Sequence, residues 1–240
     1  MACIALLFSC KKEPVETPAP GKPLTYKDSV SFVVSGKTYT FKDQHLSGTG
    51  NRQINLKPYP SEIDGRRFAI STGGFYYYGP ADSMLYEAHY SFSSYLNEYS
   101  TIRFLFTKQY KSAQLRKDIH LLVPTDNSEL LSVGKKSFAV DLDKENTTDG
   151  IALEVRLQDI SSRLSTYIPG FSILLRTDLK KDLQDNSTFE ITKCDKLKNG
   201  LYLVEGKFEV NLFNNEGKLY RLEKGFMRLV TDMKVYGVWL

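Results

Sequence analysis

The residues best suited to acid–base or metal chemistry are scattered along the chain. None of the three histidines, His45, His89 and His120, has a second His, Cys or acidic residue at the spacing of a zinc-binding helix or finger. The Gly-x-Ser-x-Gly elbow of many hydrolases is absent. Gly48-Thr49-Gly50 lacks the third glycine of a phosphate-binding loop. The sequence therefore predicts no catalytic residue, no metal site and no cofactor.

Acidic residues lie near one another in two segments, Asp141-Leu142-Asp143 and Asp178 to Asp185. Two carboxylates about 5–9.5 Å apart can hydrolyse a glycosidic bond. A polysaccharide hydrolase is therefore the alternative function, although a solvated charged loop is the simpler interpretation. Asp141, Asp143 and Glu145 alternate as in an oxygen-ligand calcium loop, but the glycine and final glutamate of the 12-residue pattern are missing.

Cys10 is the one residue whose surroundings indicate a reaction. It follows the apolar run 4–8 and ends the tetrapeptide Leu7-Phe8-Ser9-Cys10. Lys11-Lys12-Glu13 and a proline-rich stretch come next. This order resembles the lipobox of bacterial lipoproteins, which implies cleavage before Cys10 and acylation of that cysteine.

The segments around Cys10 then have simple interpretations. The apolar run is far shorter than the roughly 20 residues of a membrane-spanning helix, so residues 1–9 are interpreted as the end of a lipoprotein signal peptide. Residues 10–24 hold four prolines, which favour an extended tether. We expect a protein anchored by lipid in the outer membrane, on the cell surface.

The composition is that of a water-soluble globular domain. Hydrophobic residues make up 41% and charged residues 25% of the 240 residues, and 15 Tyr and 14 Phe favour strands. The formal net charge of +4 is spread along the chain. Nucleic-acid binding normally requires a clustered basic face, so it is not expected.

Period-two alternation of apolar residues dominates the chain after residue 28 and predicts strands. In Leu85–Phe92, Tyr86, Ala88, Tyr90 and Phe92 share one face. Tight turns are expected at Ser35-Gly36, Asn199-Gly200 and Asn214–Gly217. Helical turns are expected only in Gln109–His120 and Gln158–Pro169. The prediction is an all-β, antiparallel β-sandwich with one or two short helices, formed by a single domain over residues 25–240.

One early strand pair and one late strand add a family resemblance. The hairpin Ser35-Gly36-Lys37-Thr38-Tyr39 and the late stretch Gly200–Val210 are similar to those of uncharacterised single-domain β-sandwich lipoproteins of Bacteroidota. The resemblance covers both ends of the chain and implies the fold and the lipid anchor at Cys10. The resemblance implies no activity for any residue of this chain.

Two sets of surface residues remain as candidates. Asp28-Ser29-Val30 and Asp82-Ser83-Met84 resemble the O-glycosylation sequon of exported proteins of the same bacteria, which makes Ser29 and Ser83 candidate glycosylation sites. Tyr76, Tyr77 and Tyr78 are candidate ligand contacts, because loop tyrosines offer flat amphipathic area at low entropic cost. A strand end packed on the core is the simpler interpretation of these tyrosines.

These observations favour a non-catalytic cell-envelope protein that binds a glycan, a peptide or an envelope partner. The alternatives are the polysaccharide hydrolase and a structural subunit of an envelope complex. A binding protein retains its ligand without turnover, whereas an enzyme releases product and loses activity when one carboxylate is replaced.

Overall fold

Antiparallel strands account for almost all regular structure in this protein. The computed structural model describes residues 26–42, 45–54, 62–63, 66–67, 83–94, 97–118, 121–142, 148–168 and 180–235. The elements that build the main sheet are β1 (Ser29–Val34), β2 (Lys37–Phe41), β3 (Leu46–Ile54), β6 (Ser83–Ser94), β7 (Asn97–Lys111), β10 (Gly134–Lys135), β11 (Gly150–Leu157), β12 (Ile160–Ser165), β13 (Thr188–Lys196), β14 (Tyr202–Phe213) and β15 (Leu219–Thr231). Two small pairs stand apart, β4 (Glu62–Ile63) with β5 (Arg66–Arg67), and β8 (Arg116–Asp118) with β9 (Leu121–Val123).

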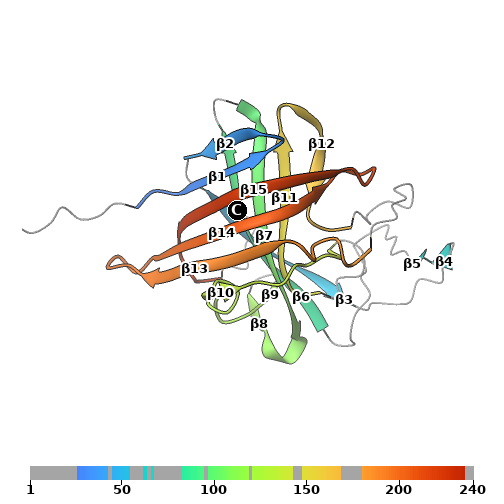
Figure 1. Ribbon diagram of the computed structural model, residues 1–240. Coiled ribbons are helices and arrows are strands. Elements are labelled where there is room, and N and C mark those ends of the chain that lie inside the picture. Colours follow the sequence, from blue (N-terminus) through green and yellow to red (C-terminus); the bar gives the residue numbers. More distant parts are fainter. Residues whose placement is uncertain are drawn as a thin grey trace, which may run out of the picture.

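The main sheet is one strongly curled half-barrel of eleven strands. Its order is β2-β1-β15-β14-β12-β11-β7-β6-β3, and β13 pairs with both β14 and β10. Figure 1 shows strands β13, β14 and β15 crossing in front of β6, β7 and β11. The all-β antiparallel prediction is therefore confirmed, and the strands of the two facing halves belong to one continuous sheet.

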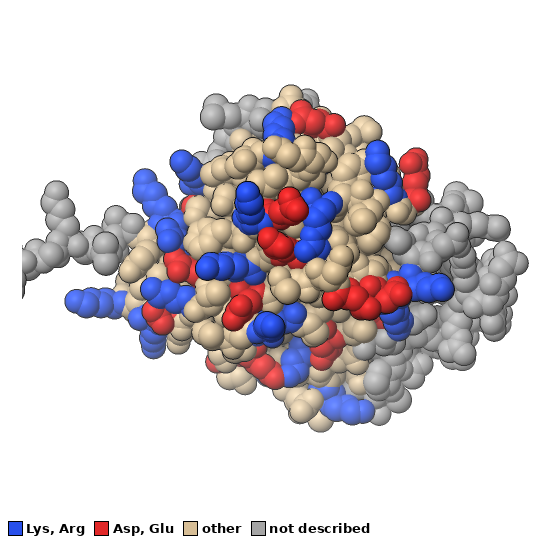
Figure 2. Space-filling view, in the orientation of Figure 1, with Lys and Arg blue, Asp and Glu red and all other residues tan. Residues whose placement is uncertain are grey.

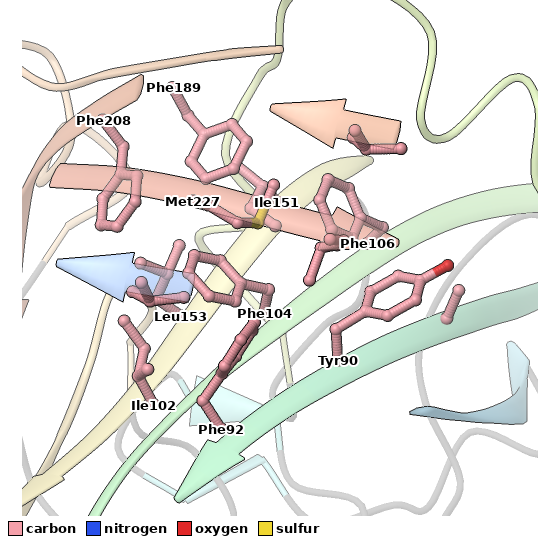
Figure 3. Close-up of a cluster of buried hydrophobic side chains, with 14 of the residues drawn as sticks. Tyr90, Phe92, Ile102, Phe104, Phe106, Ile151, Leu153, Phe189, Phe208 and Met227 are labelled. Carbon is pink, nitrogen blue, oxygen red and sulfur yellow. The ribbon is translucent and has the colours of Figure 1, made fainter. Parts of the chain in front are cut away.

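The space between the two halves is filled by aromatic rings (Figure 3). Phe104 on β7 lies 5.5 Å from Phe208 on β14 and 6.2 Å from Phe189 on β13, measured between ring centroids. Phe189 and Phe208 stack at 5.5 Å. The core residues predicted for β6 are all buried. Burial of large aromatic side chains is the main source of stability in such a core.

The predicted turns are confirmed at all three places. Ser35 and Gly36 join β1 to β2 with φ of 51° and 76°, the left-handed pair that a two-residue hairpin requires. Asn199-Gly200 lies in the connection between β13 and β14, and Gly217 in that between β14 and β15, each glycine with positive φ.

Of the two helical predictions, one turn is confirmed within Gln109–His120, and the turn expected in Gln158–Pro169 is wrong in the described residues. β7 runs through Lys111, and only a 3-10 turn, η1 (Ser112–Gln114), separates it from β8. Ile160–Ser165 is strand β12. Ile160 and Leu164 lie on the same side of this strand and pack into the core, so pairing with β11 outweighs the weak local preference for a helical turn.

The two halves of the sheet meet at a narrow seam between β12 and β14. These strands pair at one position, Ser165 with Phe213. The neighbouring part of β14, through Glu209, is already paired with β13. The side-chain amide of Gln184 fills the remaining gap. Its nitrogen donates to the carbonyls of Thr166 (2.9 Å) and Asn211 (2.7 Å), and its oxygen accepts from the Asn211 N–H (3.1 Å).

The segment that carries Gln184 is itself fastened over the seam. Leu183 packs with Val140, Ile168 and Phe213 in a small apolar cluster. The Asn211 side chain donates to the Leu183 carbonyl at 2.9 Å. Packing and hydrogen bonds therefore hold the Gln184 amide between the two halves.

Replacement of Gln184 by methionine should destabilise the protein by about 2–4 kcal/mol, because two buried carbonyls lose their donor while the side-chain volume is kept. Chemical denaturation followed by circular dichroism measures the free energy of unfolding. Gln158 is exposed and its side chain has no described partner, so Gln158→Met should change stability by less than about 0.5 kcal/mol. Equal effects of the two substitutions would contradict the role given to Gln184.

Candidate functional site

Several candidates from the sequence lie outside the described residues. These are Cys10, Tyr76, Tyr77, Tyr78 and His120. Lipidation of Cys10 and ligand contact by the three tyrosines therefore stay predictions. Among the described residues, no helix is long and apolar enough to cross a membrane.

The two candidate glycosylation sites lie on strands. Ser29 is half-buried on β1, and Ser83 is only 6% exposed at the beginning of β6. Modification of Ser83 would require that end of β6 to open. Glycosylation of both serines stays a prediction.

The acidic segment around Asp141 is held together by internal contacts. Asp141 is completely buried, and its carboxylate accepts from the Thr148 hydroxyl (2.6 Å), the Thr148 N–H (3.1 Å) and Lys181 Nζ (3.0 Å). Asp143, Glu145 and Asp178 lie outside the described residues. Within the described ranges, no group of three His, Cys, Asp or Glu side chains is placed to hold a metal ion. The described contacts give Asp141 a structural role.

Asp28 and His45 form a pair that resembles half of a catalytic triad. Asp28 Oδ2 lies 2.8 Å from His45 Nδ1, and Asp28 Oδ1 accepts from the Val230 N–H at 2.7 Å. Burial raises the pKa of Asp28, but the hydrogen bonds from His45 and Val230 outweigh burial and lower it below 3.8. The His45 ring packs edge-on against Tyr90, and Asp28 is its only hydrogen-bond partner among the described residues. The pair therefore fastens the start of β1 to β15.

Cys194 is a free, half-buried thiol on β13. Burial, together with the neighbouring Asp195, raises its pKa above 9.0. A thiol that stays protonated is a poor nucleophile, so the structure agrees with its interpretation as a small apolar residue.

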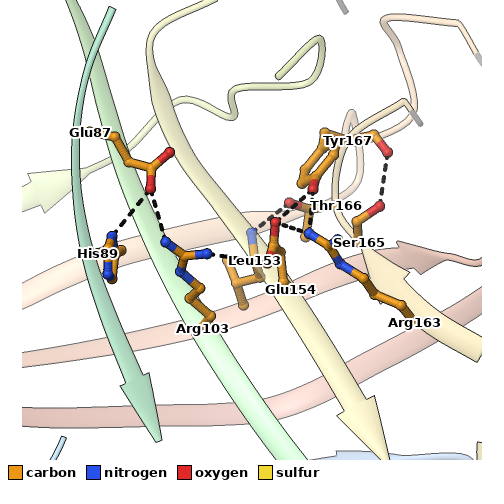
Figure 4. A network of polar contacts seen from close by, with 9 residues as sticks. All are labelled: Glu87, His89, Arg103, Leu153, Glu154, Arg163, Ser165, Thr166 and Tyr167. Carbon is orange, nitrogen blue, oxygen red and sulfur yellow. Dashed lines mark hydrogen bonds and ion pairs between the residues drawn. The ribbon is translucent and has the colours of Figure 1, made fainter. Parts of the chain in front are cut away.

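A ladder of alternating charges crosses the outer face of β6, β7, β11 and β12 (Figure 4). Arg103 lies between Glu87 (Nη2 to Oε1, 3.1 Å) and Glu154 (Nη1 to Oε2, 3.9 Å). Glu154 also pairs with Arg163 and accepts from the Tyr167 hydroxyl at 2.7 Å. The two glutamate side chains are largely buried, at 6% and 14% exposure. We call this set the charge ladder.

The charge ladder brings together carboxylates that the sequence did not single out. Glu87 and Glu154 are 67 residues apart and meet only because β7 lies between their strands. Each lies against a guanidinium group. Both glutamates alternate with apolar residues along their strands, which predicts exposure to solvent. The sequence therefore does not predict their burial.

A groove of about 620 Å³ opens beside the ladder, where β11 turns into β12. Its lining residues are Thr101, Arg156, Leu157, Gln158, Ile160, Ser161, Ser162 and Arg163. Val155 pairs with Leu164 and Leu157 with Ile160, so Arg156 alone faces three residues of β12. This bulge makes β12 arc away from β11, which opens the groove and re-aims its side chains.

Most polar side chains of the groove, unlike those of the charge ladder, form no hydrogen bonds or ion pairs with one another among the described residues. Within the described part of the chain, the side chains of Thr101, Arg156, Gln158, Ser161 and Ser162 make no hydrogen bond or ion pair. Thr101 and Arg156 are direct cross-strand neighbours. Hydroxyl, amide and guanidinium groups therefore line a concave surface with their bonding capacity unused by the protein.

A second, smaller groove lies on the opposite half of the sheet. It has a volume of about 250 Å³ and is lined in part by Lys207, Lys224, Glu190 and Glu209. Figure 2 shows Lys, Arg, Asp and Glu side chains interspersed over the face formed by β13, β14 and β15. Such mixed charge is typical of a solvated sheet face.

No protein-family model matches the chain, and no curated protein or solved structure is significantly similar to it.

The Asp28 pair should make stability depend on pH. A carboxyl with a lowered pKa stabilises the fold above its unfolded value of about 3.8, and this contribution is lost as the pH falls through the folded value. Asp28→Asn should lower the free energy of unfolding by about 1–3 kcal/mol at neutral pH, and the difference from wild type should shrink below about pH 3.8. Denaturation curves at several pH values measure it.

The exposed Asp185 offers a matched control, because its side chain has no described partner. Asp185→Asn should leave stability nearly unchanged. A deficit of Asp28→Asn that stays constant from neutral to acidic pH would rule out the ionised carboxylate as its source.

Proposed function

We propose that the protein is a lipid-anchored protein of the cell envelope that binds a glycan in the groove between β11 and β12 and does not catalyse a reaction. The two halves of the curled sheet act as the layers of a β-sandwich, and the groove lies on the outer side of one layer. Cys10 is the lipid-bearing residue, and residues 10–24 are the tether. A peptide and an envelope protein are the other ligand classes that the test below distinguishes.

The observation that supports binding is the set of unused polar groups in the groove. Sugar hydroxyls bind through hydrogen bonds with groups such as the side chains of Thr101, Gln158, Ser161 and Ser162. Because these side chains have no internal partner in the described residues, a ligand would compete only with water. The bulge in β12 supplies the concave shape that ligand sites require.

The charge ladder supports a non-catalytic role over the hydrolase alternative. Glycosidases need one carboxylic acid that keeps its proton until it protonates the leaving group. Glu154 lies against Arg163 and Arg103, and Glu87 against Arg103. Both carboxylates are engaged by arginines, and neither is among the described residues that line the groove.

The Asp28 pair suits a domain that is held at its N-terminal side. A lipid at Cys10 would pull on the chain just before β1. Asp28 joins this segment to β15 through the Val230 N–H and to His45. A force on the tether would therefore reach the main sheet through several hydrogen bonds.

The groove is tested by filling it. Wild-type protein should migrate more slowly in native gels that contain a polysaccharide to which it binds. Ser161→Trp should abolish this retardation, because the indole occupies the groove. Thr40→Trp is the matched control, since Thr40 is exposed on β2 on the other half of the sheet. Reducing ends released from the same polysaccharide are measured in parallel and should not rise.

Two outcomes would contradict this function. Retardation that survives Ser161→Trp would place the ligand elsewhere. Release of reducing ends that stops in Glu154→Gln would favour the hydrolase. If no polysaccharide is retained but a peptide or envelope protein is, and Ser161→Trp blocks that binding, the ligand class is wrong and the groove is right.

A further inference from the structure

We infer that the ligand of the groove is an acidic glycan whose carboxylate is bound by Arg156. This inference rests on the proposed function and adds the chemical class of the ligand. It starts from the difference between Arg156 and the two arginines beside it.

Among the described residues that line the groove, Arg156 carries the one positive charge without an ion-pair partner. Arg103 and Arg163 lie against Glu87 and Glu154, so the charge ladder is balanced. Arg156 continues the same outer face of β11, two residues beyond Glu154, and has no ion-pair or hydrogen-bond partner among the described residues. An anionic group is what such a guanidinium binds best.

The nearest acid on the β11–β12 turn does not compete for Arg156. Asp159 forms an ion pair with Lys37 and accepts a hydrogen bond from the Tyr39 hydroxyl at 3.2 Å. Hydrogen bonding to Lys37 lowers the pKa of Asp159, and this carboxylate is paired with Lys37 rather than with Arg156. The groove is therefore left with a net positive charge on its outer side.

The surroundings of Arg156 fit a sugar acid better than an acidic peptide. Thr101 faces Arg156 across the β7–β11 pair, and Ser161 and Ser162 lie on the arc of β12 opposite it. A carboxylate on the guanidinium fork would place the remaining hydroxyls of a sugar ring among these side chains. Peptide recognition commonly uses apolar pockets for side chains, and Ile160 is the one half-buried apolar side chain among the residues that line the groove.

The expected effect of removing Arg156 follows from the chemistry of the contact. Charge-assisted, bidentate hydrogen bonds are stronger than neutral ones, so Arg156→Ala should weaken binding about tenfold or more. Arg156→Lys keeps the charge and loses the planar fork, and should recover only part of the affinity. Because the groove is open to solvent, binding should also weaken as salt is added.

The test measures affinity by native gel electrophoresis in three carboxylate polysaccharides, polygalacturonate, alginate and hyaluronate. Methyl-esterified polygalacturonate is the matched neutral probe, because only the charge is removed. Lys207→Ala is the matched control variant, since Lys207 is an exposed cation of the second groove. The proposal predicts that at least one acidic polymer is bound, that its methyl ester is bound more weakly, and that Arg156→Ala alone abolishes the difference.

Each contrary outcome has a distinct meaning. Equal binding of acidic and neutral polymers, unchanged in Arg156→Ala and lost in Ser161→Trp, would overturn the acidic ligand and leave the proposed function standing. An equal loss in Lys207→Ala would overturn it in favour of unspecific charge attraction. Arg156-dependent binding of polyglutamate without any polysaccharide would overturn the glycan class. No retention of any neutral or acidic polysaccharide would overturn both the inference and the proposed function.

Discussion

The side-chain amide of Gln184 is the contact on which the closure of the sheet depends. β12 and β14 share one backbone pair, and a sheet that curls this strongly would expose carbonyls beside it. The Gln184 amide forms hydrogen bonds with backbone groups of Thr166 and Asn211 across the gap. It thereby takes the place of the backbone hydrogen bonds that a longer strand would make. Buried backbone groups without partners are strongly destabilising, so one amide stabilises the junction between a six-strand and a five-strand region of the sheet.

The groove depends on this junction because β12 is held at both ends. Ser165 is paired with β14 at the seam, and Ile160 is paired with Leu157 next to the turn. Three residues of β12 lie opposite the single residue Arg156 of β11, so this part of β12 must arc outward. A bulge between two fixed points is a preorganised feature, which reduces the entropy lost when a ligand binds. The same halves of the sheet are held apart at a fixed spacing by the Phe104, Phe189 and Phe208 rings.

Local pattern was sufficient to predict the strands and turns that form the core. Alternation in β6 identified Tyr86, Ala88, Tyr90 and Phe92 as inward-facing, and glycine-containing turns marked the hairpins. The alternation of apolar residues did not predict the segments whose conformation depends on pairing with a distant strand. β12 is rich in serine, and its strand conformation comes from β11 rather than from its own residues.

The candidate site was less predictable than the core. The serines, threonine and glutamine of the groove are ordinary surface residues, and only the bulge brings them together around Arg156. Gln184 bonds to a residue 27 positions away, a distance at which no sequence period operates. Glu87 and Glu154 have the alternation of exposed residues and are buried by the fold around Arg103. Cys10 and Tyr76–Tyr78 lie outside the described residues, so sequence is the sole guide there.

A groove for extracellular glycans is useful only if the domain is displayed outside the cell. The most direct measurement is fractionation of cells that express the native protein or Cys10→Ala, with protease added to intact cells. The account predicts that the native protein is found in the outer membrane, is removed by external protease, and becomes soluble in the variant. If both forms are soluble and protected from protease, the anchor and the cell-surface role are wrong.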